Sequence, residues 1–138
     1  MGTENIKYLL DTHTWIWWHI SPEKIPPKIK KIISAPPGDG SLLLHTISVW
    51  EFCKLAERRR LVLSLNPEAW LEQALDMAGL FLVPLSPALA LQSTRLPGAL
   101  HSDPADQILT ACARSFNAVL LTKDERLQKY PHIRTMWD

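Results

Sequence analysis

The chain opens its first apolar run with Ile6-Lys7-Tyr8-Leu9-Leu10, and Asp11 and Thr12 follow at once. The run is short and apolar enough for a buried strand. The next residues, 13–20, predict a helix that Thr12 caps. Asp11 therefore stands at the end of a strand, where α/β proteins build their sites.

The same alternation of strand and helix continues through the chain. Apolar runs predict further strands over 42–44, 80–85, 118–122 and 133–136. Helical patterns and cap residues predict helices over 21–34, 46–59, 66–78, 86–95, 103–116 and 124–130. This order indicates one α/β domain spanning 1–138, with a mostly parallel sheet of four to five strands and helices on both faces.

Composition narrows the class of protein. The chain has 138 residues, of which 46% are hydrophobic, the size and balance of one globular domain. A net charge of +1 means that any nucleic-acid surface is local. Cys53 and Cys112 lack metal-ligand spacing, and we expect buried free thiols in a reducing cytoplasm. We expect no signal peptide and no membrane span.

Four acidic residues fall at the ends of predicted elements: Asp11, Glu51, Asp106 and Asp124. Each has an ordinary reading by itself, as a helix cap for Asp11 and Asp124 or a solvated helix position for Glu51. Asp103, which precedes Pro104, predicts the N-cap of a helix. Asp106 then falls in the first turn, where backbone N–H groups favour an anion.

Carboxylates that converge on one point cannot all stay charged without a cation. Carboxylate oxygens without nearby Cys or clustered His favour Mg²⁺ or Mn²⁺ over zinc, and such a site suits phosphodiester hydrolysis. We expect Thr122 to hydrogen-bond a neighbouring carboxylate or simply to end a strand. Three histidines near these positions are expected in packing or surface roles: His13, His45 and His101.

Two further features point to partners. Basic residues at the end of one predicted helix would position a phosphate backbone or form a solvated helix end: Lys54, Arg58, Arg59 and Arg60. Trp15, Trp17 and Trp18 crowd one short helix, which indicates burial in the core or in an interface.

In order and spacing, these motifs resemble PIN-domain ribonucleases, specifically the toxin component of VapBC-type toxin–antitoxin modules. The resemblance covers nearly the whole chain. Gln107 replaces an Arg that is common in the family after the second Asp, and Lys54 is one position closer to Glu51 than usual. Neither change removes a carboxylate. The matching segments are Leu9 to Trp15, Ser48 to Glu51, Leu96-Pro97, His101, Asp103 to Gln107, Leu120 to Asp124, and Tyr130.

The resemblance implies that Asp11, Glu51, Asp106 and Asp124 are the acidic metal-binding and catalytic residues, supported by other residues. It further implies Mg²⁺- or Mn²⁺-dependent endoribonuclease activity, a homodimer, and inhibition by a cognate antitoxin that inserts a segment into the acidic site. The supporting residues from the resemblance would be Thr12 and Thr122. Asp103, as the expected helix cap, would support the site by shaping the loop.

Three other classes of protein share part of this pattern. A response-regulator receiver domain has a similar size and an acidic Mg²⁺ pocket, but it needs an acidic pair near the first strand and an Asp after the strand at 42–44. A haloacid-dehalogenase-like phosphatase needs Asp-x-Asp, whereas this chain has Asp11-Thr12-His13. The third class, a PIN-like module that binds RNA or protein without cleaving RNA, remains an alternative.

Overall fold

The computed structural model describes residues 6–138. The strands and helices follow one another in the predicted order. Their bounds are β1 Tyr8–Leu10, α1 Thr12–Ile20, the 3₁₀ helix Pro22–Lys24, α2 Pro27–Ser34, β2 Leu42–His45, α3 Thr46–Glu57, α4 Pro67–Leu75, β3 Leu80–Val83, α5 Pro87–Ser93, α6 Pro104–Ser115, β4 Val119–Leu121, α7 Glu125–Gln128 and β5 Arg134–Met136.

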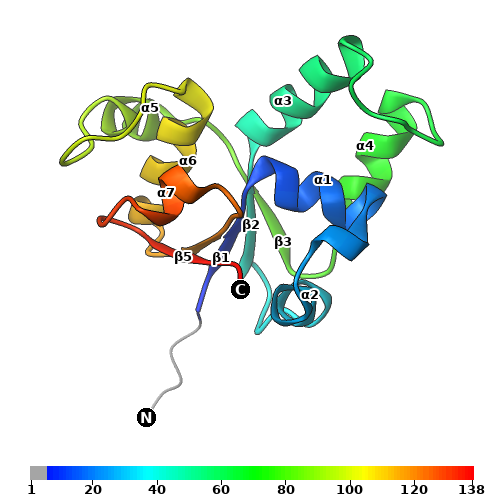
Figure 1. The fold of residues 1–138 in the computed structure, drawn as a ribbon, viewed down its shortest axis with the longest axis horizontal. Helices are drawn as coiled ribbons and strands as arrows, with labels where there is room; N and C mark the ends of the chain where they lie inside the picture. The colour runs from blue at the N-terminus through cyan, green and yellow to red at the C-terminus, as the bar shows by residue number, and fades with distance from the viewer. Residues whose placement is uncertain (1–5) are drawn as a thin grey trace.

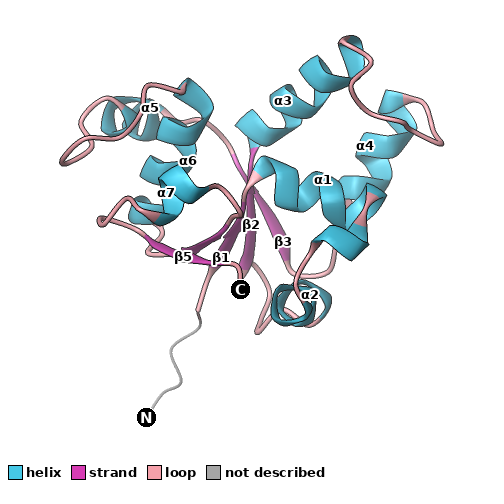
Figure 2. Cartoon of the chain, viewed as in Figure 1, coloured by secondary structure: helices cyan, strands magenta, loops and turns pink. Residues whose placement is uncertain are grey.

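The five strands form one parallel sheet in the order β3-β2-β1-β4-β5. Helices α1 to α4 cover one face and α5 to α7 cover the other (Figure 1). Figure 2 shows the strands as a central layer between these two groups of helices. The prediction of an α/β fold with a parallel sheet and two helical layers is confirmed.

The strands divide their side chains between two cores, because successive residues of a strand point to opposite faces. Leu10 and Leu44 join a core with the aromatic residues of α1, α3 and α4. Leu9 and Leu43 join a second core with α5, α6 and α7. In the first core the rings of Phe52 and Trp70 stack 4.0 Å apart, and Trp15 packs edge-on against both. Burial on both faces explains why the three inner strands, β1, β2 and β4, are continuous apolar runs.

The strand order reverses between β1 and β4. The chain leaves β1 into α1 on one face, and it leaves β4 towards α7 on the other face. Such a reversal opens a crevice beyond the carboxyl ends of the two strands. Asp11 follows β1 and lines this crevice. Thr122 follows β4 and is fully buried.

Several predicted details of the helices are wrong. Asp11, not Thr12, caps α1, since its carboxylate accepts a hydrogen bond from the backbone N–H of Thr12. The helix expected from Ser21 breaks into a 3₁₀ turn and α2, because the Pro26-Pro27 pair lacks the N–H groups that a continuous helix needs.

The predicted burial of both thiols is also only half correct. Cys112 lies in the core, where burial raises its pKa to about 12. Cys53 is exposed, because its neighbour Phe52 takes the core-facing side of α3. Within residues 6–138, no helix combines the length and the apolar content needed to cross a bilayer.

Candidate metal and nuclease site

A pocket of about 390 Å³ opens at the point where the strand order reverses. All four predicted ligands and Asp103 line it, and they come from the end of β1, from α3, from the start of α6 and from the loop after β4. The structure therefore brings together carboxylates that are up to 113 positions apart, Asp11 to Asp124, in the sequence. The remaining lining residues are His13, Thr14, Trp17, Lys123 and Arg126.

Asp11 is the most deeply buried of these carboxylates, with 8% of the residue exposed. Thr122 donates its hydroxyl proton to Asp11 Oδ2 at 2.6 Å, and the backbone N–H of Thr12 donates to Oδ1 at 2.7 Å. Thr122 Oγ1 also accepts from the backbone N–H of Asp124 at 3.0 Å. The Thr122 hydroxyl thus connects the end of β1 to the loop after β4.

Glu51 is held by a chain of hydroxyl groups. Thr12 Oγ1 donates to Glu51 Oε1 at 2.5 Å, and Ser48 Oγ lies 2.7 Å from Thr12 Oγ1. Since the single proton of Thr12 goes to Glu51, Ser48 is the donor to Thr12. Thr12 therefore fixes one oxygen of Glu51, and Ser48, which the sequence analysis did not single out, orients Thr12.

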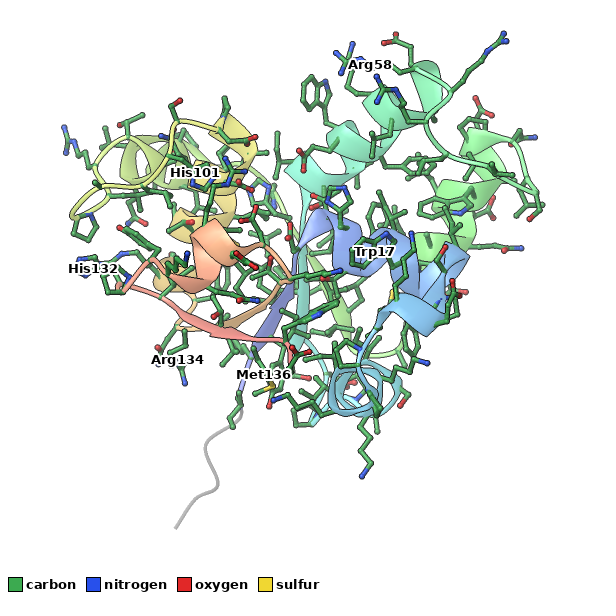
Figure 3. All side chains as sticks on the ribbon, viewed as in Figure 1. Trp17, Arg58, His101, His132, Arg134 and Met136 are labelled. Atoms are coloured by element: carbon green, nitrogen blue, oxygen red, sulfur yellow. The ribbon has the colours of Figure 1, made fainter. Side chains whose placement is uncertain are left out.

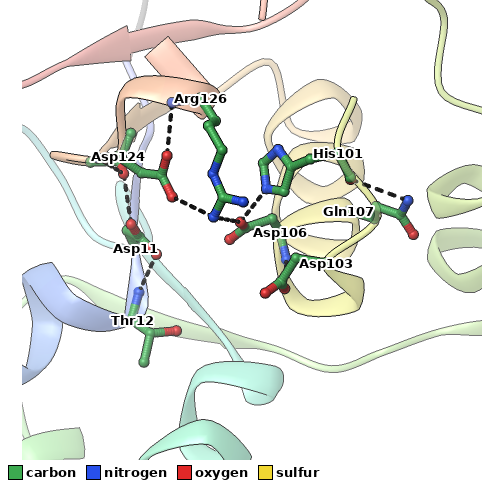
Figure 4. A network of polar contacts seen from close by, with 9 residues as sticks. Asp11, Thr12, His101, Asp103, Asp106, Gln107, Asp124 and Arg126 are labelled. Carbon is green, nitrogen blue, oxygen red and sulfur yellow. Dashed lines mark hydrogen bonds and ion pairs between the residues drawn. The ribbon is translucent and has the colours of Figure 1, made fainter. Parts of the chain in front are cut away.

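Asp106 is positioned by its helix and by a histidine. Asp103 caps α6 as predicted, with its Oδ1 accepting from the backbone N–H of Asp106 at 3.1 Å. His101 Nε2 lies 2.5 Å from Asp106 Oδ2 (Figure 4). The amide of Gln107 donates to the His101 carbonyl at 3.5 Å. The expectation of a mere packing or surface role for His101 is therefore wrong, because it orients a pocket carboxylate.

Asp124 caps α7 and contacts Arg126, which also lines the pocket. Its Oδ1 accepts from the backbone N–H of Arg126 at 2.8 Å. The Arg126 guanidinium reaches Asp124 Oδ2 at 3.4 Å and Asp106 Oδ2 at 3.8 Å (Figure 4). Burial acts to raise the Asp124 pKa, but the hydrogen bonds and charge of Arg126 outweigh it, so the pKa is lowered.

The pKa values of the other three carboxylates are raised instead. Burial is the largest cause of a raised pKa at Asp11, Glu51 and Asp106, and neighbouring carboxylates add to it. Asp11 and Glu51 have no Lys, Arg or His within 4.0 Å among the residues that the structure describes. Asp11 is buried and Glu51 is partly buried without such a partner, which fits a pocket that binds a cation.

The donor set fits a hard divalent ion, since it is made of carboxylate and hydroxyl oxygens. Across residues 6–138, however, no three His, Cys, Asp or Glu side chains are already drawn together as a metal-binding group. The carboxylates surround the pocket, while Arg126 and His101 hold Asp106 and Asp124. The predicted close convergence of the four ligands is thus absent from this conformation.

The predicted basic patch lies outside this pocket. None of its members lines the pocket, and Arg58, Arg59 and Arg60 are exposed at the end of α3. Figure 3 shows Arg58 at the outer end of α3, away from His101. Lys54 forms an ion pair of 2.8 Å with Glu57. The role of these residues in binding RNA stays a prediction.

The other residues singled out from the sequence have mainly structural roles. His45 is fully buried and caps α3 through Nδ1, and burial lowers its pKa to about 4. Trp15 is core, as one reading predicted. Trp17 is partly exposed and contacts Lys123, whose Nζ lies 5.7 Å from its ring centre. His13 also lines the pocket.

Comparisons with known proteins agree with this arrangement. The family model described as the PIN domain matches residues 8–133. Ribonuclease VapC22 of Mycobacterium tuberculosis is 31% identical over 131 residues, covering 94% of this chain and 97% of that protein. The residues matched by the family model include Asp11, Glu51, Asp106 and Asp124.

Solved structures show the same fold. DNA-bound VapBC from Salmonella typhimurium matches with a TM-score of 0.69 at 23% identity, covering 95% of this chain and 97% of the other. A toxin–antitoxin complex from Klebsiella pneumoniae matches with a TM-score of 0.65 at 18% identity, covering 94% and 96%. The family match over most of the chain sets the receiver-domain reading aside. The chain belongs to the PIN-domain family.

Proposed function

We propose that this protein is a VapC-type endoribonuclease that hydrolyses RNA phosphodiester bonds with Mg²⁺ or Mn²⁺. The observation that carries the proposal is the pocket that Asp11, Glu51, Asp106 and Asp124 all line. The similarity to ribonuclease VapC22 over 94% of the chain supports the choice of reaction. The domain responsible would span the chain, 1–138.

The four carboxylates would hold the divalent ion, which offsets charge on the phosphate and makes water a better nucleophile at neutral pH. Thr122 and the N–H of Thr12 hold Asp11 in a fixed orientation, and Thr12 does the same for Glu51. His101 and the Asp103 cap fix Asp106. Pre-set orientation matters because small displacements of catalytic groups cost large factors in rate.

Water would attack the phosphorus in line with the bond to the 3′ oxygen of the upstream nucleotide. That bond breaks, the upstream fragment leaves with a 3′ hydroxyl, and the downstream fragment keeps a 5′ phosphate. Substrate RNA would lie over the pocket mouth, and the exposed charges of Lys54, Arg58, Arg59 and Arg60 would contact the backbone beyond it.

The test is cleavage of single-stranded RNA by purified protein in Mn²⁺, with and without EDTA. We expect EDTA to abolish cleavage. Asp106→Asn should lower the rate by at least about 100-fold, since metal-based charge stabilisation is worth several kcal/mol. Glu72→Gln, a neutralisation on the exposed side of α4, is the matched control and should keep full activity.

Equal cleavage by wild type and Asp106→Asn would mean that a contaminating nuclease is being measured. No cleavage by either protein, with Mn²⁺ bound to the wild type, would favour the alternative of a PIN-like binding module. A 5′ hydroxyl on the downstream product would contradict the water-attack chemistry.

We also propose that the protein is a cytoplasmic toxin, forms a homodimer and is held inactive by a cognate antitoxin. The structural similarity to DNA-bound VapBC and to a toxin–antitoxin complex supports this assignment. Exposed apolar side chains on β3 and beyond, Phe81, Leu82 and Leu85, offer surface for a protein partner. Sedimentation tests the dimer, and relief of growth arrest by co-expressed antitoxin tests the pairing.

A further inference from the structure

Arg126 places a positive charge inside the acidic pocket. Its guanidinium Nη2 lies 3.4 Å from Asp124 Oδ2 and 3.8 Å from Asp106 Oδ2. Figure 4 shows the guanidinium between the two carboxylates. Within the described chain, no other Arg or Lys comes within 4.0 Å of a pocket carboxylate. Arg126 therefore offers one positive charge to two carboxylates that would help to hold a cation.

The backbone of Arg126 is held in place, whereas its guanidinium group is largely exposed. The backbone N–H donates to Asp124 Oδ1 at 2.8 Å, which fixes the Cα at the start of α7. The side chain is 61% exposed, and both guanidinium contacts are long for hydrogen bonds. Exposed ion pairs of this kind are weak, so the guanidinium can leave the carboxylates without moving the backbone.

We propose that Arg126 is a built-in counter-ion that exchanges partners. It occupies the place between Asp106 and Asp124 in the metal-free protein, and a divalent ion competes with it for the same oxygens. The released guanidinium then contacts a phosphate oxygen of the RNA. The inference rests on the proposed metal-dependent function and deepens it by assigning a phosphate-contacting residue.

Chemistry favours this exchange. A carboxylate oxygen that coordinates a divalent ion has little charge left for a guanidinium, which is then repelled by the ion. Guanidinium groups bind phosphate through paired N–H donors, and this match is better than the single long contacts observed with the carboxylates. The pocket mouth, where Arg126 is exposed, is also where a phosphate would arrive.

The first measurement is calorimetric titration of Mn²⁺ into metal-stripped wild type, Arg126→Ala and Lys123→Ala. Lys123 lines the same pocket, but its Nζ lies over the Trp17 ring and within 4.0 Å of no carboxylate. If Arg126 competes directly, Arg126→Ala should bind Mn²⁺ about fivefold more tightly. Lys123→Ala removes one charge without freeing an oxygen, so its affinity should change by less than about twofold.

The second measurement is the fluorescence anisotropy of a labelled single-stranded RNA with the same three proteins. Ca²⁺ replaces Mn²⁺ to slow hydrolysis, and a gel confirms that the RNA is intact. Arg126→Ala should bind this RNA about fivefold more weakly, with a salt dependence lower by roughly 0.7 in slope. A purely structural role of Arg126 would not tighten metal binding and weaken RNA binding together.

Equal Mn²⁺ affinities in all three proteins, or equal tightening by Arg126→Ala and Lys123→Ala, would overturn the exchange. Unchanged RNA binding by Arg126→Ala would overturn the phosphate contact. Failure of the proposed function looks different, because it would show in the wild type itself, which would then bind no Mn²⁺ or would bind Mn²⁺ and leave RNA uncut. The Asp124 cap uses the backbone N–H of residue 126, so the Ala variant keeps it and should fold normally.

Discussion

At the scale of single residues, most of the pocket carboxylates also help to begin a helix. Asp11 caps α1, Asp124 caps α7, and Asp103 caps α6 while Asp106 occupies the first turn of that helix. The reading of Asp11 and Asp124 as helix caps is therefore confirmed, while their role as metal ligands stays a prediction. Glu51, in the body of α3, neither caps a helix nor lies in a first turn, so its burial is a cost to the metal-free fold.

This cost predicts the effect of Glu51→Gln in EDTA. Burial, then the charges of Asp11, Asp103 and Asp106, raise the Glu51 pKa in the folded protein above its unfolded value. Ionised Glu51 thus lowers the free energy of unfolding at a pH above its folded pKa. The penalty fades as the pH falls through that pKa, and it is absent once the unfolded carboxyl is also protonated, below about 4.3.

Glu51→Gln should therefore raise the free energy of unfolding in urea at pH 8 and leave it unchanged near pH 3.5. Gln keeps an oxygen that accepts from Thr12, so the hydroxyl chain survives. Saturating Mn²⁺ should reverse the order of stability at pH 8, because only wild type keeps all four carboxylates. A variant less stable than wild type at pH 8 in EDTA would show that Glu51 is not under strain from burial.

At the scale of helices and loops, the sequence predicted what short-range rules govern. Asp103-Pro104 indicated the start of α6, and Asn66-Pro67 indicated the start of α4. His101 and Arg126 were missed as site residues for a physical reason. His101 belongs to a loop whose path follows from tertiary packing, and Arg126 lies on a helix of four residues whose direction depends on the Asp124 cap. The nearest signal was the position of Arg126 two residues after an expected ligand.

The α6 cap yields a prediction that separates structure from charge. Asp103→Ala should lose about 1 kcal/mol of stability, because the backbone N–H of Asp106 loses its partner. Asp103→Asn keeps the cap and should unfold in urea like wild type. If cleavage by Asp103→Asn also matches wild type, Asp103 acts only through the cap. Equal stability of the Ala variant and wild type would contradict the cap.

At the scale of the whole molecule, the site depends on strand order. The apolar runs predicted a parallel sheet, but the order β3-β2-β1-β4-β5 arises from contacts between distant segments that no local pattern encodes. That order places β1 beside β4, where the Thr122 hydroxyl binds Asp11 across 111 positions of sequence. For the same reason, the sequence did not reveal that the basic end of α3 lies outside the pocket.

The central claim is that this pocket cuts RNA, and mapping the 5′ ends of cellular RNA tests it most directly. RNA would be sequenced after induction of wild type and, in parallel, of Asp11→Asn at matched protein levels. Wild type should produce discrete new 5′-phosphate ends, and Asp11→Asn should produce none above the uninduced background. The same new ends in both samples, or no new ends with soluble wild type, would contradict the assignment of the pocket as a ribonuclease site.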